Sequence, residues 1–239
     1  MAIHIFKSPL DIMPSLAENF VKIANEAIQE NGICNIVLAG GNSPQKLYEL
    51  LTTDAYKTQV DWRKIYFFFG DERYVPADDP QSNSFMVQKA LFNPLKISQS
   101  HIFKIDTTLS PVEAAKKYDA TIVSHFKNKR VEFDLILLGL GDNAHTASLF
   151  PFTPILSEST ATVMAVFLKE QNSTRITMTA PLINQSKHIV FLVYGKEKAE
   201  AVYHVLKYVQ DVAKYPAQLI NPVSGELQWF LDEAAASLL

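Results

Sequence analysis

The chain has 239 residues, 48% of them hydrophobic, and a formal net charge of −3 at pH 7. That length and apolar content are enough to bury one sizeable core or two small ones. The near-neutral charge balance, with no basic block or regular basic stripe, does not favour nucleic-acid binding.

Three further features of the sequence favour a cytoplasmic protein. Cys34 is the only cysteine, so it has no partner for an internal disulfide or a Cys-type metal site. Residues 1–7 lack the basic region and long apolar run of a signal peptide. No segment approaches the ~20 apolar residues of a membrane span. We therefore expect a reduced, soluble protein.

Apolar runs of strand length alternate along the chain with segments of helical period. Strands are expected at 33–39, 64–69, 133–140, 161–167 and 188–194. Helices are expected at 10–29, 44–51, 84–91, 111–126 and 196–208. Several of the apolar runs lack polar alternation, as strands buried on both faces do. The pattern predicts one α/β domain over 1–239, with a mostly parallel, twisted, Rossmann-like sheet and helices on both faces.

Segment 71–83 differs from its surroundings because it carries charges and two prolines and has no period. It reads as a loop, and loops of that length are usually functional or disordered. Three charged residues, Asp71, Glu72 and Arg73, come almost directly after the apolar run 64–69. They fit either a solvated loop with a surface ion pair or a polar cleft. The cleft is favoured, because open α/β sheets bind ligands at the carboxyl ends of their strands.

The run 33–39 leads into Gly40, Gly41, Asn42 and Ser43, and then into a helical segment. Two glycines allow close backbone approach to a ligand, and a helix N-terminus attracts anions. The segment is therefore a candidate phosphate cradle. The alternative is an ordinary turn in which Ser43 caps the helix.

Two basic residues are further candidates for binding a phosphate. Lys198 lies in the first turn expected after 188–194, where a lysine opposes the helix dipole unless an anion is bound. Arg175 sits where a strand is expected to begin and is able to bind a phosphate through two N–H groups. The alternative for both side chains is that they are exposed to solvent and bind no ligand.

His145 follows the strand end at 133–140 after a glycine-rich turn, and the other five histidines lie in apolar or helical contexts. A histidine at a strand end is able to move a proton at neutral pH, although a structural role also fits. Residues 139–144 formally match the Gly-x-Gly-x-x-Gly/Ala dinucleotide fingerprint. That match is disfavoured because it lies in mid-chain and Pro151 follows soon after.

Taken together, these loops resemble the 6-phosphogluconolactonase family over nearly the whole chain. The similar motifs are residues 40–44, 71–76 with Ser82 and Asn83, 139–151, 175–177, 195–199 and the tail 228–235. The resemblance implies a fold shared with glucosamine-6-phosphate isomerase/deaminase and ribose-5-phosphate isomerase. It also implies hydrolysis of 6-phosphogluconolactone to 6-phosphogluconate, the second step of the oxidative pentose phosphate pathway, without a metal or organic cofactor.

The resemblance also suggests roles for the candidate residues. His145 would act as general base, and Arg73 or backbone N–H groups would stabilise the oxyanion. Gly40 to Ser43, Arg175 and Lys198 would hold the phosphate, and Asp71 would position Arg73 or contact sugar hydroxyls. The family usually has Asp-Gly where this chain has Asn143 and Ala144. An asparagine orients the histidine ring but does not stabilise its cationic form.

Three alternatives to the lactonase remain at this stage. A glucosamine-6-phosphate isomerase/deaminase is disfavoured because no glutamate follows His145 within the motif. A catalytically weak sugar-phosphate-binding relative is compatible with Asn143. An NAD-binding enzyme rests only on residues 139–144. The expected partner is a small phosphosugar lactone, and the chain is expected to be a monomer or a small homo-oligomer.

Overall fold

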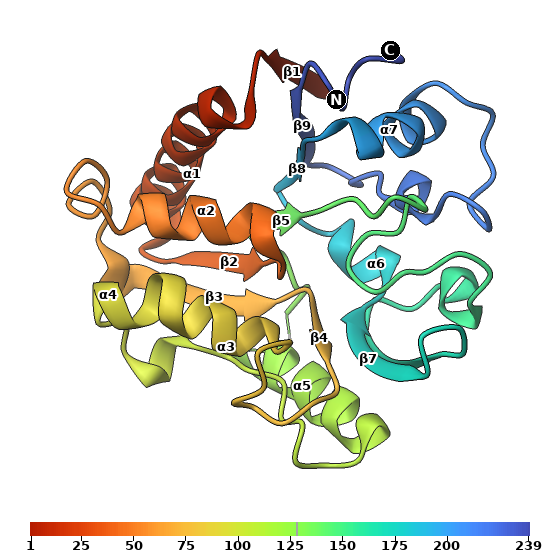
Figure 1. The fold of residues 1–239 in the computed structure, drawn as a ribbon. Helices are drawn as coiled ribbons and strands as arrows, with labels where there is room; N and C mark the ends of the chain where they lie inside the picture. Colours follow the sequence, from red (N-terminus) through yellow and green to blue (C-terminus); the bar gives the residue numbers. More distant parts are fainter. Residues whose placement is uncertain (128) are drawn as a thin grey trace.

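The computed structural model describes residues 1–127 and 129–239. Six strands form the main sheet, in the order β1-β9-β8-β5-β2-β3, and all neighbouring pairs are parallel (Figure 1). Their bounds are β1 (Ala2–Phe6), β2 (Cys34–Leu38), β3 (Ile65–Phe69), β5 (Leu135–Leu138), β8 (His188–Val193) and β9 (Glu226–Asp232). The predicted α/β class and the parallel sheet are confirmed.

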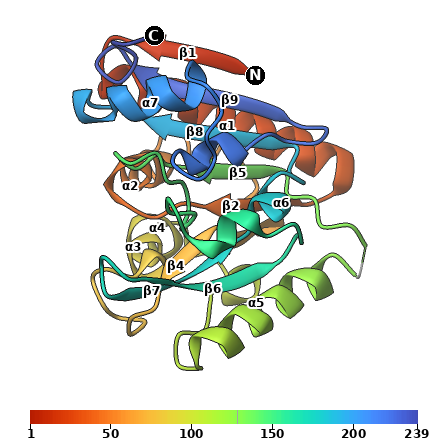
Figure 2. The same ribbon diagram turned by 90° about the vertical axis from the view of Figure 1, so that its right-hand side faces the viewer.

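A second, antiparallel sheet has the order β4-β7-β6 (Figure 2). It consists of β4 (Asp71–Arg73), β7 (Ser173–Met178) and β6 (Val163–Leu168). Two predictions are corrected here. The run 161–167 does not join the parallel sheet, and the first three residues of the predicted loop 71–83 form a strand. Charged residues are tolerated in β4 because Asp71 and Arg73 remain partly exposed while pairing with β7.

The outer strands β1 and β9 were not predicted from periodicity. β1 is an edge strand whose first four residues are exposed, so it lacks the continuous apolar run of a buried strand. It pairs with β9 in the register Ala2↔Gln228 to Phe6↔Asp232. β1 therefore depends on a partner more than 200 residues away, which no local pattern reveals, whereas β9 also pairs with β8.

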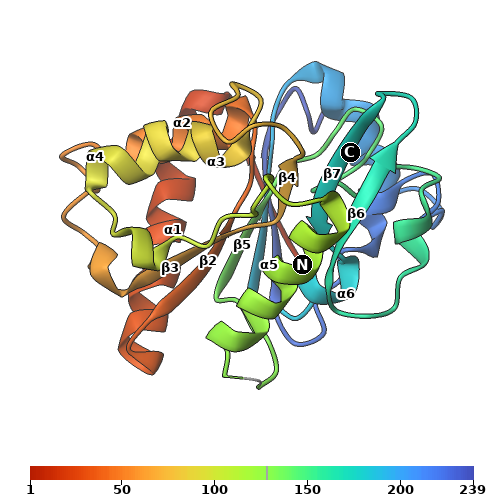
Figure 3. The same cartoon turned by 90° about the horizontal axis from the view of Figure 1, so that it is seen from below.

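Helices cover both faces of the main sheet, as predicted. Figure 3 shows α1, α2 and α3 on one side, and α5, α6 and the small sheet on the other. The α-helices are α1 (Pro9–Asn31), α2 (Asn42–Leu51), α3 (Asn83–Val87), α4 (Asn93–Leu95), α5 (Pro111–His125), α6 (Ala180–Ile183) and α7 (Ala199–Leu206). The short helical turns are η1 (Trp62–Lys64), η2 (Gln88–Phe92), η3 (Gln99–His101), η4 (Pro154–Ser157), η5 (Lys196–Lys198) and η6 (Pro216–Leu219).

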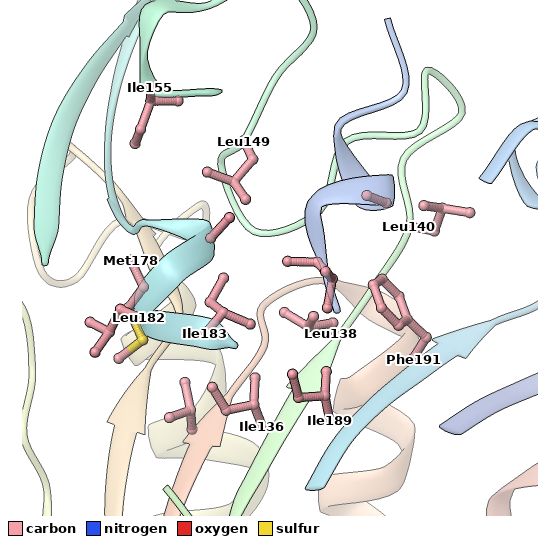
Figure 4. Packing of buried hydrophobic residues seen from close by; sticks show 14 of the residues in the cluster. Ile136, Leu138, Leu140, Leu149, Ile155, Met178, Leu182, Ile183, Ile189 and Phe191 are labelled. Atoms are coloured by element: carbon pink, nitrogen blue, oxygen red, sulfur yellow. The ribbon is translucent and has the colours of Figure 1, made fainter. Parts of the chain in front are cut away.

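The sheet separates two apolar cores, one on each face. Alternate residues of a strand enter opposite cores, so Phe67 and Phe69 pack with α1 and α2 while Phe68 packs with α5. Figure 4 shows part of the core on the α5 side, where Ile136 lies below Ile183 of α6 and Phe191 lies beside Leu138. Burial on both faces explains the apolar runs without polar alternation.

Two buried tyrosines hold the carboxyl ends of β2 and β3 from opposite cores. The hydroxyl of Tyr48, on α2, accepts from the N–H of Ala39 at 3.0 Å and donates to its carbonyl at 2.8 Å. The hydroxyl of Tyr118, on α5, does the same for Phe69 at 2.7 and 3.1 Å. Each hydroxyl satisfies two backbone groups that would otherwise be buried without partners.

We expect Tyr118→Phe to lower the free energy of unfolding by about 1–3 kcal/mol, because two buried backbone groups of Phe69 lose their partner. Urea denaturation followed by circular dichroism measures this loss. Tyr56→Phe is the control, since the Tyr56 ring is buried and its hydroxyl makes no hydrogen bond within the described chain. Equal stability of the two variants would contradict the proposed anchoring.

Candidate active site

A cavity of about 260 Å³ opens at the carboxyl ends of the parallel strands. β2 and β5 lie side by side there, although the chain continues from β2 to β3 on one side and from β5 to β8 on the other. Such a switch point is where open α/β sheets bind ligands. Eight of the ten predicted site residues line the cavity: Gly40, Gly41, Asn42, Ser43, Asp71, Arg73, His145 and Lys198.

The side chain of Asn143 lies behind the cavity and fixes the protonation pattern of the His145 ring. Oδ1 of Asn143 accepts from the backbone N–H of His145 at 3.3 Å and lies 2.6 Å from Nδ1 of the ring. Because this amide oxygen only accepts, Nδ1 carries the hydrogen and Nε2 keeps a free lone pair. Asn143 therefore holds the ring in the tautomer whose Nε2 lone pair is free to accept a hydrogen bond or a proton.

The His145 ring packs closely against Phe150 and Gly141. It stacks on Phe150 with ring centroids 4.0 Å apart and an interplanar angle of 16°. A Cβ at Gly141 would lie 2.0 Å from Nδ1, so a larger residue there would displace the ring. The turn also places Ala144 at φ +61°, in the left-handed region that favours glycine.

His145 is kept neutral by its surroundings. Burial is the largest cause and lowers its pKa from 6.5 to about 4, with a smaller contribution from the positive charge of Lys198. The carboxylate of Asp71 opposes this shift, and Asp142 does so to a smaller extent. The imidazole is consequently an unprotonated base at neutral pH.

Asp71 and Arg73 both line the cavity, but they do not bind each other. Asp71 accepts from the hydroxyl of Ser148 at 2.5 Å and from the side-chain amide of Asn83 at 3.2 Å. Arg73 donates to the backbone carbonyl of Gln81 at 2.7 Å. Within residues 1–127 and 129–239, no ion pair joins Asp71 to Arg73, so a direct positioning of Arg73 by Asp71 is not found.

A buried carboxylate that the sequence analysis assigned no role holds this region together. Glu72 is 2% exposed and accepts from the backbone N–H groups of Arg73, Asn83 and Ser84 and from the hydroxyl of Ser82. Burial is the main cause that raises its pKa. Glu72 thereby joins the two ends of the segment between β4 and α3.

Asn83 is a second residue without a predicted role. It is 1% exposed, lines the cavity, and donates to the backbone carbonyl of Asp71 at 2.9 Å. Its Oδ1 is buried without a hydrogen-bond partner in the described residues, and a Cβ at Gly40 would lie 1.7 Å from it. Gly40 is thus required for close packing against Asn83. The only sequence signal for Asn83 was its place in the family motif.

The loop after β2 presents the N-terminus of α2 to the cavity. Gly41, at φ +99°, is the N-cap residue, and no side chain caps the helix. The alternative in which Ser43 caps α2 is therefore wrong, because the helix already begins at Asn42. Uncapped N–H groups and the helix dipole at this end attract an anion.

Lys198 and Arg175 are placed differently. Lys198 lines the cavity at the end of η5, next to α7. Arg175 lies on β7 directly opposite Arg73 and outside the cavity lining, and its guanidinium donates to Gln171 at 3.2 Å. Burial chiefly, and the neighbouring Arg73 charge, lower the pKa of Arg175. Two adjacent guanidinium groups repel each other unless an anion lies nearby.

Over the described ranges, no three His, Cys, Asp or Glu side chains gather closely enough to hold a metal ion. None of the helices seen in those ranges has both the length and the apolar character needed to cross a membrane.

We expect the His145 ring to remain neutral down to about pH 5, because its pKa lies near 4. Asn143→Asp places a carboxylate beside Nδ1 and should raise this pKa. Titration of the His145 Cε1 proton signal by NMR measures the pKa in both proteins. A His145 midpoint near 6.5 in the unchanged protein would contradict the burial argument.

The comparisons with known proteins agree with this geometry. A 6-phosphogluconolactonase from Synechocystis sp. is 39% identical over 218 residues, covering 90% of this chain and 88% of that protein. One from Haemophilus influenzae is 36% identical, covering 91% and 94%. The structure of 6-phosphogluconolactonase from Trypanosoma cruzi superposes with a TM-score of 0.88 at 27% identity, covering 100% of this chain and 96% of that one.

A structure of a monomeric glucosamine-6-phosphate deaminase superposes with a TM-score of 0.83 at 23% identity, covering 100% of both chains, which shows a shared fold. Residues 7–229 match the family described as glucosamine-6-phosphate isomerases/6-phosphogluconolactonase. The match spans nearly the whole sequence and includes the loops after β2, β3, β5 and β8. The chain therefore belongs to the glucosamine-6-phosphate isomerase/6-phosphogluconolactonase family.

Proposed function

We propose that the chain hydrolyses 6-phospho-D-glucono-1,5-lactone to 6-phospho-D-gluconate, in the oxidative branch of the pentose phosphate pathway. One observation carries the proposal. A neutral histidine with a free Nε2 shares a cavity with a helix N-terminus and Lys198, two groups that attract a phosphate. The relatives named 6-phosphogluconolactonase support this substrate.

Lactone hydrolysis needs an activated water, a stabilised oxyanion and a protonated leaving oxygen. In the proposed mechanism, Nε2 of His145 takes a proton from water as the water oxygen bonds to the lactone carbonyl carbon. Arg73 or the N–H groups of the glycine turns stabilise the resulting oxyanion. The bond between that carbon and the ring oxygen then breaks, and His145 returns the proton to the ring oxygen.

The imidazolium formed during this cycle needs a nearby negative charge. Asn143 orients the ring but carries no charge, whereas Asp71 lines the same cavity and raises the His145 pKa electrostatically. We assign this support to Asp71, which Ser148 and Asn83 hold in place. The same carboxylate is suited to accept hydrogen bonds from substrate hydroxyls.

The phosphate end of the site comprises Gly40, Gly41, Asn42, Ser43 and Lys198, with Arg175 adding positive charge beside Arg73. Holding the phosphate there orients the lactone carbon for attack. These steps use only the side chains and backbone groups of the protein, and no metal or organic cofactor is part of the proposal.

The residues after His145 do not support the deaminase alternative. His145 continues into Thr146, Ala147 and Ser148, and the carboxylate that raises the pKa of the ring most is that of Asp71 on β4. A proton relay for ring-opening isomerisation would need a further carboxylate in this turn.

The proposed reaction, together with the buried and unpaired Cys34, favours the cytoplasm. A monomer or a small homo-oligomer stays a prediction.

His145→Ala should lower kcat by about 10²–10⁴-fold, because the general base is removed. The assay uses freshly generated 6-phosphogluconolactone and subtracts spontaneous hydrolysis. His4→Ala, which changes an exposed histidine on β1, should retain full activity. Near-normal turnover in His145→Ala would remove His145 from the mechanism.

Lys198→Ala should raise KM by roughly 10–100-fold, since a partly buried charge-assisted contact to phosphate is worth about 1.5–3 kcal/mol. The effect on kcat should be smaller, because the phosphate lies away from the reacting carbon. Lys196→Ala is the matched control, because this exposed lysine occupies the same turn outside the cavity. An unchanged KM in Lys198→Ala would refute its role as a phosphate ligand.

A further inference from the structure

A second cavity lies behind the loop that carries His145. Its volume is about 590 Å³, within the roughly 300–1,000 Å³ of small-molecule sites. Its lining comprises the loop residues Asn143 and 150–154, the end of β6 with the turn that follows it (167–171), and Lys214 with Tyr215. It shares no lining residue with the first cavity, so it is a separate feature of the molecule.

Two exposed phenylalanines converge on this cavity. Phe152 is 77% exposed and has φ +59°, so its backbone is strained and its ring gains little from burial. Phe167, on β6, is 60% exposed. Folding alone gives no reason for either aromatic ring, whereas exposed aromatics around one hollow are typical of a binding site. Tyr215 adds a third aromatic wall.

The charges of the lining favour an anion. Lys169 and Lys214 contribute two positive charges, and Glu170 is the single acidic residue of the lining. The Lys214 ammonium lies 5.3 Å from the centroid of the Tyr215 ring, so positive charge sits against an aromatic wall. A planar aromatic molecule with an anionic substituent would match both features.

The wall between the two cavities consists of the side chains that hold His145. Phe150 stacks on the His145 ring and also lines the second cavity. Asn143 is hydrogen-bonded to Nδ1 of His145 and likewise lines the second cavity. A molecule in the second cavity would thus touch both supports of the ring.

We propose that the second cavity binds a planar aromatic anion and that the bound molecule acts on His145 through Phe150 and Asn143. The binding site itself does not depend on the lactonase assignment. Its consequence for catalysis rests on the proposed function, because His145 is the proposed base.

The binding test uses 8-anilinonaphthalene-1-sulfonate, an aromatic sulfonate whose fluorescence rises in apolar sites, with the full chain. We expect saturable binding of one molecule, weakened about tenfold by Phe167→Ser and about two- to fivefold by Lys214→Ala. Phe152→Gly should also weaken binding, and it relieves the positive φ, so the variant should fold. Leu10→Ser and Lys22→Ala, exposed changes on α1, should leave binding unchanged.

Two outcomes of this titration would overturn the site. In one, the variants Phe167→Ser and Phe152→Gly bind the probe as tightly as the unchanged protein does. The other is binding that Lys198→Ala, in the first cavity, weakens and Lys214→Ala leaves unchanged, which would place the probe in the first cavity.

The effect of the bound molecule on His145 is tested separately, by the NMR signals of the histidines in the complex of the protein with the probe. Saturating probe should shift the ring signals of His145 and leave those of His4 in place. Probe binding with unchanged His145 signals would overturn this effect. Neither readout requires lactonase activity, so failure here is distinguishable from failure of the proposed function.

Discussion

Burial of the parallel sheet on both faces is the constraint on which the site depends. Apolar side chains fill both faces, so polar groups are tolerated chiefly where strands end. Tyr48 and Tyr118 satisfy the backbone at two of those ends from opposite cores. The loops that follow therefore start from fixed positions at the edge of the sheet.

The sequence allowed the principal site residues to be predicted because each follows an apolar run. His145, Lys198 and the segment 40–43 all lie just beyond strand ends, and a parallel sheet gathers such ends at one edge. Contacts between residues far apart in the sequence could not be predicted in this way. Ser148 reaches Asp71 across 77 residues, and β1 depends on β9. The single domain over 1–239 stays a prediction, as do the roles of the site residues.

A single carboxylate beside a histidine is able both to orient the ring and to supply a negative charge. At His145 these two tasks fall to different residues. Asn143 fixes the orientation of the ring through its amide oxygen, while the negative charge that favours the imidazolium comes from Asp71 on β4. Ring geometry and ring charge are consequently set by different elements of the fold. The small antiparallel sheet, which carries Asp71, is thereby part of the electrostatics of the histidine as well as of its enclosure.

The pairing of β1 with β9 has a consequence for how the protein is made. β1 is an edge strand bonded only to β9, so it has no strand partner until synthesis has reached β9, more than 200 residues further along the chain. Until then the backbone N–H and C=O groups of β1 lack a strand partner and are open to pairing with another chain. Pairing of β1 with β9 is thus a late step, and its long sequence separation slows the completion of the sheet.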